Sequence, residues 1–125
     1  MKLQKLISKL EKHHKKKLDL SLGRTFNLLK KLGNPQDKLK NVVTVVGTNA
    51  KASMCYSLKS ILNKAGHKTN LYTSPHLLSY TERYDFEDKE INEEDLIKLL
   101  TDIEKTLGDD NATLFEILTL SLIHI

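Results

Sequence analysis

The chain has 125 residues, 39% of them hydrophobic, which is enough for one modest domain with an apolar core. No run approaches the roughly 20 apolar residues that cross a bilayer, so a membrane-spanning protein is excluded. Lysine and arginine outnumber the acidic residues by 20 to 16, and the single Cys55 excludes an internal disulfide and suits a small core position.

The net charge of +4 raises the question of nucleic-acid binding. The densest basic cluster, residues 12–17, lacks interleaved aromatic side chains, and no nucleic-acid fold signature accompanies it. We therefore expect a solvated basic face, which also suits anionic small substrates, and no nucleic-acid partner.

The first two predicted elements are helices. Residues 1–14 carry apolar side chains at helical spacing among lysines, without the continuous apolar region of a signal peptide. We expect an amphipathic surface helix, no membrane partner and a cytoplasmic protein. Residues 21–32 repeat the apolar spacing, and Gly33, Asn34 and Pro35 provide stop signals.

Residues 41–46 are rich in β-branched side chains, with four valines and a threonine, and show little polar alternation. They predict a central parallel strand buried on both faces. Residues 53–65 then predict a helix that Gly66 ends. Its expected apolar face consists of Met54, Leu58, Ile61, Leu62 and Ala65.

A short turn of small residues joins this strand to this helix and carries one lysine, Lys51. A helix N-terminus offers free backbone N–H groups and a partial positive charge, so the turn predicts a phosphate-binding loop for a nucleotide. Lys51 would reach the outer phosphates, and the Ser53 hydroxyl would bind Mg²⁺. The alternative is an ordinary strand-to-helix turn with a solvated lysine.

Two alanines, Ala50 and Ala52, stand where phosphate loops usually have glycine. If either site requires a left-handed backbone, alanine there costs on the order of 1 kcal/mol or more.

After this helix, residues 68–72 predict a short strand, and residues 73–76 a loop because Pro75 disfavours helix before it. Residues 83–86 predict a further strand, or one arm of a hairpin that turns at residues 87–89. Asn92 is an expected N-cap for a helix that Gly108 ends.

The last segment, residues 113–125, is apolar on nearly every side and predicts a helix that contacts protein on several sides. A chain that stops there looks truncated, and the strand-helix-strand units call for more parallel strands to complete an open sheet.

Five blocks in one order resemble the bifunctional dihydrofolate synthase and folylpolyglutamate synthase enzymes, ATP-dependent ligases related to the cell-wall Mur ligases. The blocks are residues 7–26 with the core Leu18-Asp19-Leu20-Ser21-Leu22, residues 32–36, residues 47–53, residues 71–77 with Thr81-Glu82-Arg83, and residues 113–116.

This resemblance implies an α/β fold: a three-layer α/β/α, P-loop-containing, Mur-ligase-like central ATPase domain with a mostly parallel sheet, incomplete in this chain. Residues 1–125 would be the N-terminal part of that ATP-binding domain. The rest of it and the C-terminal glutamate-ligase domain would lie beyond Ile125, with the remaining Mg²⁺ ligands, so the chain alone is expected to be inactive. The complete enzyme is expected to be a monomer.

The resemblance also implies site residues. ATP would contact Gly47, Thr48, Asn49, Ala50, Lys51, Ala52 and Ser53, with Lys51 catalytic, and Ser74 would be a ligand of Mg²⁺. Dihydropteroate would contact Asp19, Leu20, Ser21, Leu22, Thr113, Leu114, Phe115 and Glu116. His76 and Arg83 are candidate contacts of substrate or phosphate.

The reaction that the resemblance implies joins L-glutamate to dihydropteroate, and to folates, through an acyl phosphate made with ATP. Positioning and charge neutralisation would supply most of the catalysis. The competing hypothesis is a non-catalytic nucleotide-binding or interaction module with a degenerate loop.

Several of these residues also have a plainer interpretation. Ser74 is a typical turn residue before proline, and His76 an exposed loop histidine. Arg83 would pair with Glu82 or a nearby acid on the surface. Asp19 would cap the helix that starts near Ser21. Glu116, near the start of a buried helix, would favourably face the helix dipole. A carboxylate that enters an apolar segment is nevertheless costly without a partner, which favours a site.

Overall fold

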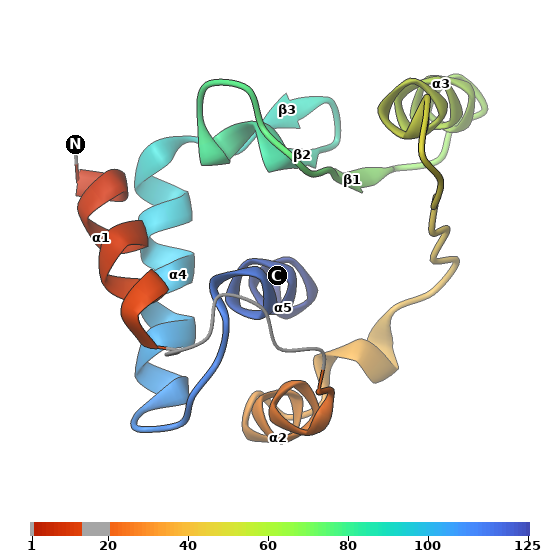
Figure 1. Ribbon diagram of the computed structural model, residues 1–125. Helices are drawn as coiled ribbons and strands as arrows, with labels where there is room; N and C mark the ends of the chain where they lie inside the picture. The colour runs from red at the N-terminus through yellow and green to blue at the C-terminus, as the bar shows by residue number, and fades with distance from the viewer. Residues whose placement is uncertain (1, 14–20) are drawn as a thin grey trace. The chain divides into compact units, whose positions relative to one another are not determined.

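The computed structural model describes residues 2–13 and 21–125 (Figure 1). The chain divides into two compact units, Met1–Lys40 with Glu93–Ile125, and Asn41–Asn92. No helix in these described ranges is both long and apolar enough to span a membrane. Asp19 and Leu20, and most of the basic cluster at residues 12–17, lie outside the described residues.

The first unit is helical. Its elements are α1 (Lys2–Leu10), η1 (Glu11–His13), α2 (Gly23–Lys31), η2 (Pro35–Lys38), α4 (Glu93–Leu107) and α5 (Leu114–His124). Helix α1 lies along α4 (Figure 1), and α5 packs against α4, α2 and η2. The core is made of Leu3, Ile7, Leu10, Leu28, Leu29, Leu96, Leu100, Ile103, Leu107, Ala112, Ile117, Leu118 and Leu120.

Two sequence predictions are confirmed in this unit. Helix α1 buries Leu3, Ile7 and Leu10 and exposes its lysines, as an amphipathic surface helix does. Helix α5 is covered on several sides, since Ile117, Leu118 and Leu120 are all within 1% of complete burial.

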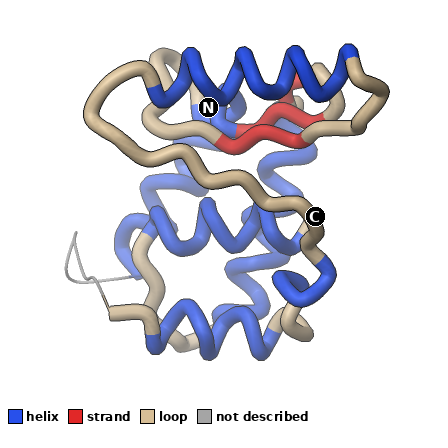
Figure 2. Tube along the Cα trace, turned by 90° about the vertical axis from the view of Figure 1, so that its right-hand side faces the viewer, coloured by secondary structure: helices blue, strands red, loops and turns tan. Residues whose placement is uncertain are grey.

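The second unit combines a helix with a small sheet. Its elements are α3 (Lys51–Lys64), β1 (Asn70–Tyr72), η3 (Tyr80–Arg83), β2 (Tyr84–Phe86) and β3 (Lys89–Glu90). Helix α3 runs alongside the strands and contacts β1 (Figure 2). The strand order is β1-β2-β3, and Leu71 faces Asp85 across the first pair.

Both strand pairs are antiparallel, which corrects the expectation of a mostly parallel sheet for the strands that the structure describes. The hairpin alternative is confirmed for β2 and β3. The turn between them holds Glu87 at φ 49° and Asp88 at φ 68°, and two successive left-handed residues match the right-handed twist of a hairpin.

The strand expected at residues 41–46 is wrong, because the structure gives these residues no strand pairing. Val42, Val43 and Val46 are 66%, 63% and 84% exposed rather than buried on two faces. Valine favours an extended backbone, but a strand also needs a neighbour for its N–H and C=O groups. Within the described residues no strand pairs with this segment.

Helix α3 begins at Lys51, two residues before the expected start, and ends as expected at Gly66, which has φ +88°. The N–H groups of Gly66 and His67 donate back to Asn63 and Leu62, as at a left-handed helix end.

The apolar face expected for α3 is wrong in part, because Met54 and Ile61 are 58% and 65% exposed and Ala65 is exposed too. Cys55, Leu58, Lys59 and Leu62 form the covered side instead, with Lys59 the most buried of them.

Candidate functional site

The turn before α3 leaves a helix N-terminus open to solvent. The first bond of the helix runs from the Met54 N–H to the Ala50 carbonyl, over 2.9 Å, and no side chain caps the helix. The N–H groups of Lys51, Ala52 and Ser53 precede that bond, so they have no carbonyl partner within the helix. These amides and the positive end of the helix dipole therefore suit an anion.

Lys51 is the first residue of α3 and is half-buried. Its Cγ lies 4.0 Å from the position that a Cβ on Gly47 would take, so the lysine stem lies against Gly47. Gly47 has φ +154°, a backbone conformation that side chains with a Cβ rarely adopt. The described residues provide no carboxylate for the ammonium group, and Thr48 and Asn49 are exposed.

The two alanines of the turn differ in conformation. Ala50 has φ 59° and ψ 14°, so it adopts the left-handed conformation that alanine disfavours. Ala52 lies inside the first turn of α3, where alanine is the best residue. The strain expected from the sequence therefore falls on Ala50 alone.

Residues 73–83 form a closed loop that contains Ser74, His76 and Arg83. The Thr73 N–H donates to the Arg83 carbonyl over 3.0 Å and closes the base of the loop. Ser74 is exposed, next to a cis peptide bond to Pro75.

The carboxylate of Glu82 holds residues 77–79 of this loop in place. It accepts hydrogen bonds from the N–H groups of Leu77, Leu78 and Ser79 at 2.8, 2.7 and 2.7 Å. The bond from Leu77, followed by those from Ser79 and Leu78, lowers the pKa of Glu82 below its ordinary value.

The structure brings His76 and Arg83 into direct contact. Arg83 Nε donates to His76 Nδ1 over 2.9 Å, and the rings of His76 and Tyr80 lie 4.1 Å apart between centroids. Burial, with the positive charge of Arg83, lowers the pKa of His76 below its ordinary value, which favours the neutral imidazole. The alternative pairing of Arg83 with Glu82 is not the one observed, since Glu82 binds backbone amides.

Arg24 joins the two segments expected to contact dihydropteroate. Its Nη1 lies 3.4 Å from Ser21 Oγ, and its Nη2 lies 3.1 Å from Glu116 Oε1. Thr25 Oγ1 also donates to Glu116, over 3.1 Å. Ser21 and Glu116, which are 95 positions apart in the sequence, are therefore bridged by one guanidinium group.

Glu116 caps the start of α5, which goes beyond the favourable position at the helix dipole that the sequence predicts. Its Oε2 accepts from the Thr113 N–H over 2.7 Å, and Thr113 Oγ1 accepts from the Glu116 N–H, which forms a capping box at the start of α5. The Thr-x-x-Glu spacing was the signal for this box, whereas no motif marked Arg24 or Thr25. The carboxylate thus has the partners that an apolar segment requires.

Burial opposes the charge of Glu116, but hydrogen bonds from Thr113, Arg24 and Thr25 outweigh it and lower the pKa of Glu116 below its ordinary value. In the same two segments Leu22 and Phe115 are 64% and 58% exposed, so they offer apolar surface beside this charged bridge. Thr113 is buried and Leu114 half-buried.

Lys59 is a second residue that the sequence did not single out. It is 7% exposed, and its Nζ lies 2.7 Å from Asp85 Oδ2 and 3.0 Å from Asp88 Oδ1. Burial alone lowers the pKa of Lys59, but the hydrogen bonds and charges of the two aspartates outweigh it and raise the pKa. This network ties α3 to the β2–β3 hairpin.

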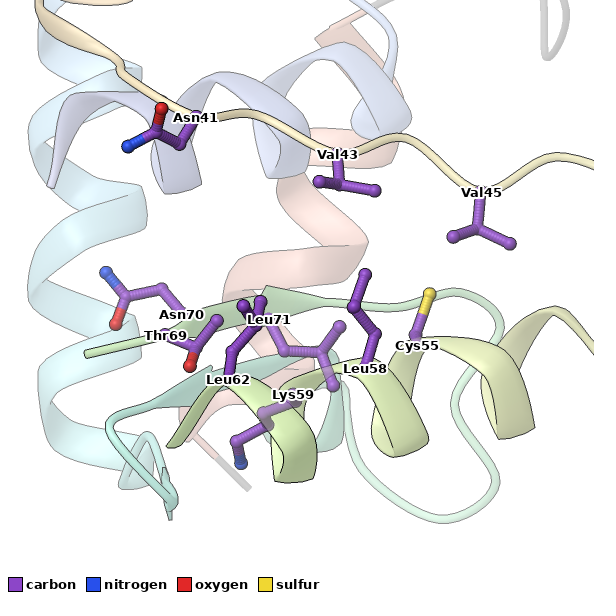
Figure 3. Close-up of a pocket in the computed structure, with 10 residues that line it drawn as sticks. All are labelled: Asn41, Val43, Val45, Cys55, Leu58, Lys59, Leu62, Thr69, Asn70 and Leu71. Atoms are coloured by element: carbon purple, nitrogen blue, oxygen red, sulfur yellow. The ribbon is translucent and has the colours of Figure 1, made fainter. Parts of the chain in front are cut away.

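A pocket of about 100 Å³ lies between residues 41–45 and α3 (Figure 3). Val43 and Val45 point into it from one side, and Leu58, Leu62 and Leu71 line the other. Cys55 is a half-buried part of this lining, which agrees with a small packing residue. None of residues 47–53 lines the pocket, so it is separate from the open helix N-terminus.

The metal-binding capacity of the described residues is limited. They contain no group of three or more His, Cys, Asp or Glu side chains that would hold a metal ion. Ser53 and Ser74 contribute exposed hydroxyl oxygens. Since Mg²⁺ prefers six oxygen ligands that include carboxylates, these hydroxyls fit part of a site and need further ligands.

Comparison with known proteins finds similar sequences and similar solved structures from one family. No protein-family model matches the chain. The dihydrofolate synthase/folylpolyglutamate synthase of Escherichia coli is 41% identical over 115 residues, which are 92% of this chain and 27% of that protein. This chain therefore spans about a quarter of the length of the curated relatives that it matches.

Solved structures agree with the sequence matches. "E.coli FolC in complex with DHPP and ADP" superposes with a TM-score of 0.88 at 40% identity and covers 98% of this chain and 29% of that one. The Yersinia pestis bifunctional enzyme complexed with AMPPNP and Mn ion has the same TM-score at 35% identity, and covers 97% of this chain and 29% of that one. Along nearly its whole length, this chain is homologous to a segment of the dihydrofolate synthase/folylpolyglutamate synthase family.

Proposed function

We propose that this chain forms part of an ATP-dependent ligase that joins L-glutamate to dihydropteroate, and to folates, through an acyl phosphate. The observation that carries the proposal is the open N-terminus of α3, with its free amides beside Lys51. It occurs in a chain that is 40% identical to a solved enzyme holding DHPP and ADP. A related solved enzyme holds Mn, AMPPNP and L-glutamate.

The fold proposal follows the same homology. Residues 1–125 would form the N-terminal part of a three-layer, P-loop-containing, Mur-ligase-like ATP-binding domain. The rest of that domain would then cover Val42, Val43 and Val46, which are exposed here. The remainder of that domain and a glutamate-ligase domain would come from a longer polypeptide, and the chain alone is expected to lack ligase activity.

For ATP, Gly47, Thr48, Asn49, Ala50, Lys51, Ala52 and Ser53 would surround the phosphates. The amides of Lys51, Ala52 and Ser53 would donate to phosphate oxygens, and the Lys51 ammonium group would neutralise charge as the phosphoryl group moves. Ser74 would supply one oxygen ligand to Mg²⁺, which when bound would neutralise negative charge on the phosphates.

For dihydropteroate, we propose contacts with Asp19, Leu20, Ser21, Leu22, Thr113, Leu114, Phe115 and Glu116. Leu22 and Phe115 suit an aromatic ring because they are exposed and apolar. Glu116 is held in place by Arg24 and Thr25, so its main role in this proposal is to fix the geometry of that site.

The reaction consists of two substitutions. A carboxylate oxygen of dihydropteroate attacks the γ-phosphorus of ATP, and ADP leaves. The glutamate amine then attacks the acyl carbon, phosphate leaves, and the amine gives up a proton as the amide forms. The chain needs no nucleophilic side chain for this chemistry, because its contribution is positioning and charge neutralisation.

The ligase assignment is tested by measuring phosphate release by the complete polypeptide that contains this sequence. Release should require dihydropteroate, L-glutamate, ATP and Mg²⁺ together, and omission of any one should abolish it. Release that continues unchanged without dihydropteroate would contradict the assignment.

One observation favours a second candidate, a nucleotide-binding module without catalysis. Ala50 holds a strained left-handed backbone directly before Lys51, which weakens the loop where a phosphate would approach. This candidate predicts ADP binding without ligation in the complete polypeptide.

A further inference from the structure

We infer that Arg83 is a positioning residue for His76: it fixes the imidazole so that the Nε2–H edge is presented as a hydrogen-bond donor to a phosphate oxygen. The inference deepens the proposed function, because the phosphate would belong to the nucleotide or to the acyl phosphate of that reaction. The Arg83–His76 contact and the closed loop that carries it are its basis.

The hydrogen bond between the two side chains determines where the imidazole proton lies. Arginine has donors and no acceptor, so the 2.9 Å contact from Arg83 Nε requires His76 Nδ1 to accept. A neutral imidazole that accepts at Nδ1 carries its proton on Nε2. His76 is therefore prepared as a donor at the edge of the ring that faces away from Arg83.

Packing holds the ring in this orientation. The His76 ring lies 4.1 Å from the Tyr80 ring, and the Arg83 guanidinium carbon lies 5.3 Å from the centre of the same Tyr80 ring. One tyrosine thus supports both partners of the hydrogen bond, and the bond itself resists rotation of the imidazole.

The backbone around the pair is fixed as well. The Thr73–Arg83 hydrogen bond closes the loop at its base, and Glu82, the neighbour of Arg83, binds the amides of Leu77, Leu78 and Ser79. His76 therefore lies between two anchored points, and little conformational freedom remains to be lost on binding a ligand.

The Nε2–H side of the His76 imidazole is suited to bind an anion. Among residues 2–13 and 21–125, none forms a hydrogen bond with His76 Nε2, and His76 is only half-buried, so a ligand can reach it. A neutral donor next to a guanidinium group favours a negatively charged oxygen, and a phosphate offers several such oxygens to both groups.

The bond itself can be tested by NMR of the ¹⁵N-labelled chain. We expect a ¹⁵N–¹⁵N coupling across the hydrogen bond between Arg83 Nε and His76 Nδ1, and a proton on Nε2. Arg83→Leu should remove the coupling and return His76 to the tautomer mixture of the exposed His67. Arg83→Lys should keep part of the preference for Nε2–H. Lys68→Leu, at a side chain that is 80% exposed, is the control and should leave the His76 signals unchanged.

The ligand is tested by titration with inorganic phosphate, with acetate and chloride as separate arms. The Nε2–H resonance should shift with saturation in phosphate, and the shift should fall at least several-fold in Arg83→Leu. A larger response to acetate would overturn the choice of phosphate over carboxylate. Absence of the coupling, or a phosphate response that Arg83→Leu leaves intact, would overturn the positioning role.

The two proposals fail in distinguishable ways. If the coupling and the phosphate response are present but the complete polypeptide does not ligate, the ligase assignment fails and the positioning role stands. If ligation occurs and Arg83→Leu changes neither kcat nor the KM for ATP, the positioning role fails alone.

Discussion

Arg24 Nη2 and Glu116 Oε1 lie 3.1 Å apart and connect helix α2 to the first turn of α5. Both side chains are mostly covered, with 19% and 11% exposed, so solvent screens the pair less than a surface ion pair. The same carboxylate completes the cap of α5. One side chain therefore stabilises a helix end and joins two helices.

Glu116→Gln should destabilise the first unit by about 1–3 kcal/mol, because it removes the charge that accepts hydrogen bonds from Arg24, Thr25 and Thr113. Chemical denaturation followed by circular dichroism measures the loss. Asp110→Asn is the matched control: its pair with Lys31 is nearly half exposed at both ends, so the change should cost about 0–1 kcal/mol. Equal effects of the two substitutions would contradict this role of Glu116.

Acid should weaken the same contact. The pKa of Glu116 is lower in the folded chain than its ordinary value of 4.5, so its contribution is present above pH 4.5 and is lost as pH falls through the folded pKa. The stability of the wild-type chain should therefore drop more steeply below pH 4.5 than that of Glu116→Gln. Parallel pH profiles of the two proteins would rule out this linkage.

Replacing Ala50 or Ala52 by glycine should change the stability of the chain in opposite directions. Ala50→Gly should stabilise the chain by about 1 kcal/mol, because glycine adopts φ 59° without strain. Ala52→Gly should destabilise it by about 1 kcal/mol, because it places glycine within α3. Calorimetry with ADP should also show tighter binding to Ala50→Gly. A loss of stability in Ala50→Gly would show that the left-handed conformation is absent.

Lys59→Met should cost about 3 kcal/mol, because it leaves Asp85 largely buried without its cation. The double variant Lys59→Met, Asp85→Leu should recover much of this loss, because the carboxylate that still loses its cation, Asp88, is 67% exposed and solvated. Lys68→Met is the control: Lys68 is 80% exposed and its pair with Glu87 should matter little. Additive losses in the double variant would show that Lys59 and Asp85 are not coupled.

The sequence predicted where helices begin and end better than it predicted which segments pair or pack together. Apolar spacing located α1, α4 and α5, and glycine located the ends of α3 and α4, because helix signals depend on residues close in the chain. Residues 41–46 were predicted as a strand from β-branched content alone, whereas pairing depends on residues far away in the sequence.

The same limit applies to the candidate site. The turn at residues 47–53 and the Thr113–Glu116 segment were visible as short motifs. Ala50 and Ala52 were marked as sites where a left-handed backbone would be strained, and Ala50 adopts it. The contacts of Arg24 with Glu116 and of Arg83 with His76 were not visible, because they depend on where long side chains reach in three dimensions. The buried Lys59 was missed for the same reason.

The central claim is that residues 47–53 bind the phosphates of ATP at the N-terminus of α3. The most direct measurement is an amide NMR titration of the ¹⁵N-labelled chain with ADP, with and without Mg²⁺, compared with Lys51→Met. The account predicts saturable shifts that are largest at the amides of Lys51, Ala52 and Ser53 and are strongly reduced in Lys51→Met. Shifts confined to other parts of the chain, or no saturable response at these amides, would contradict it.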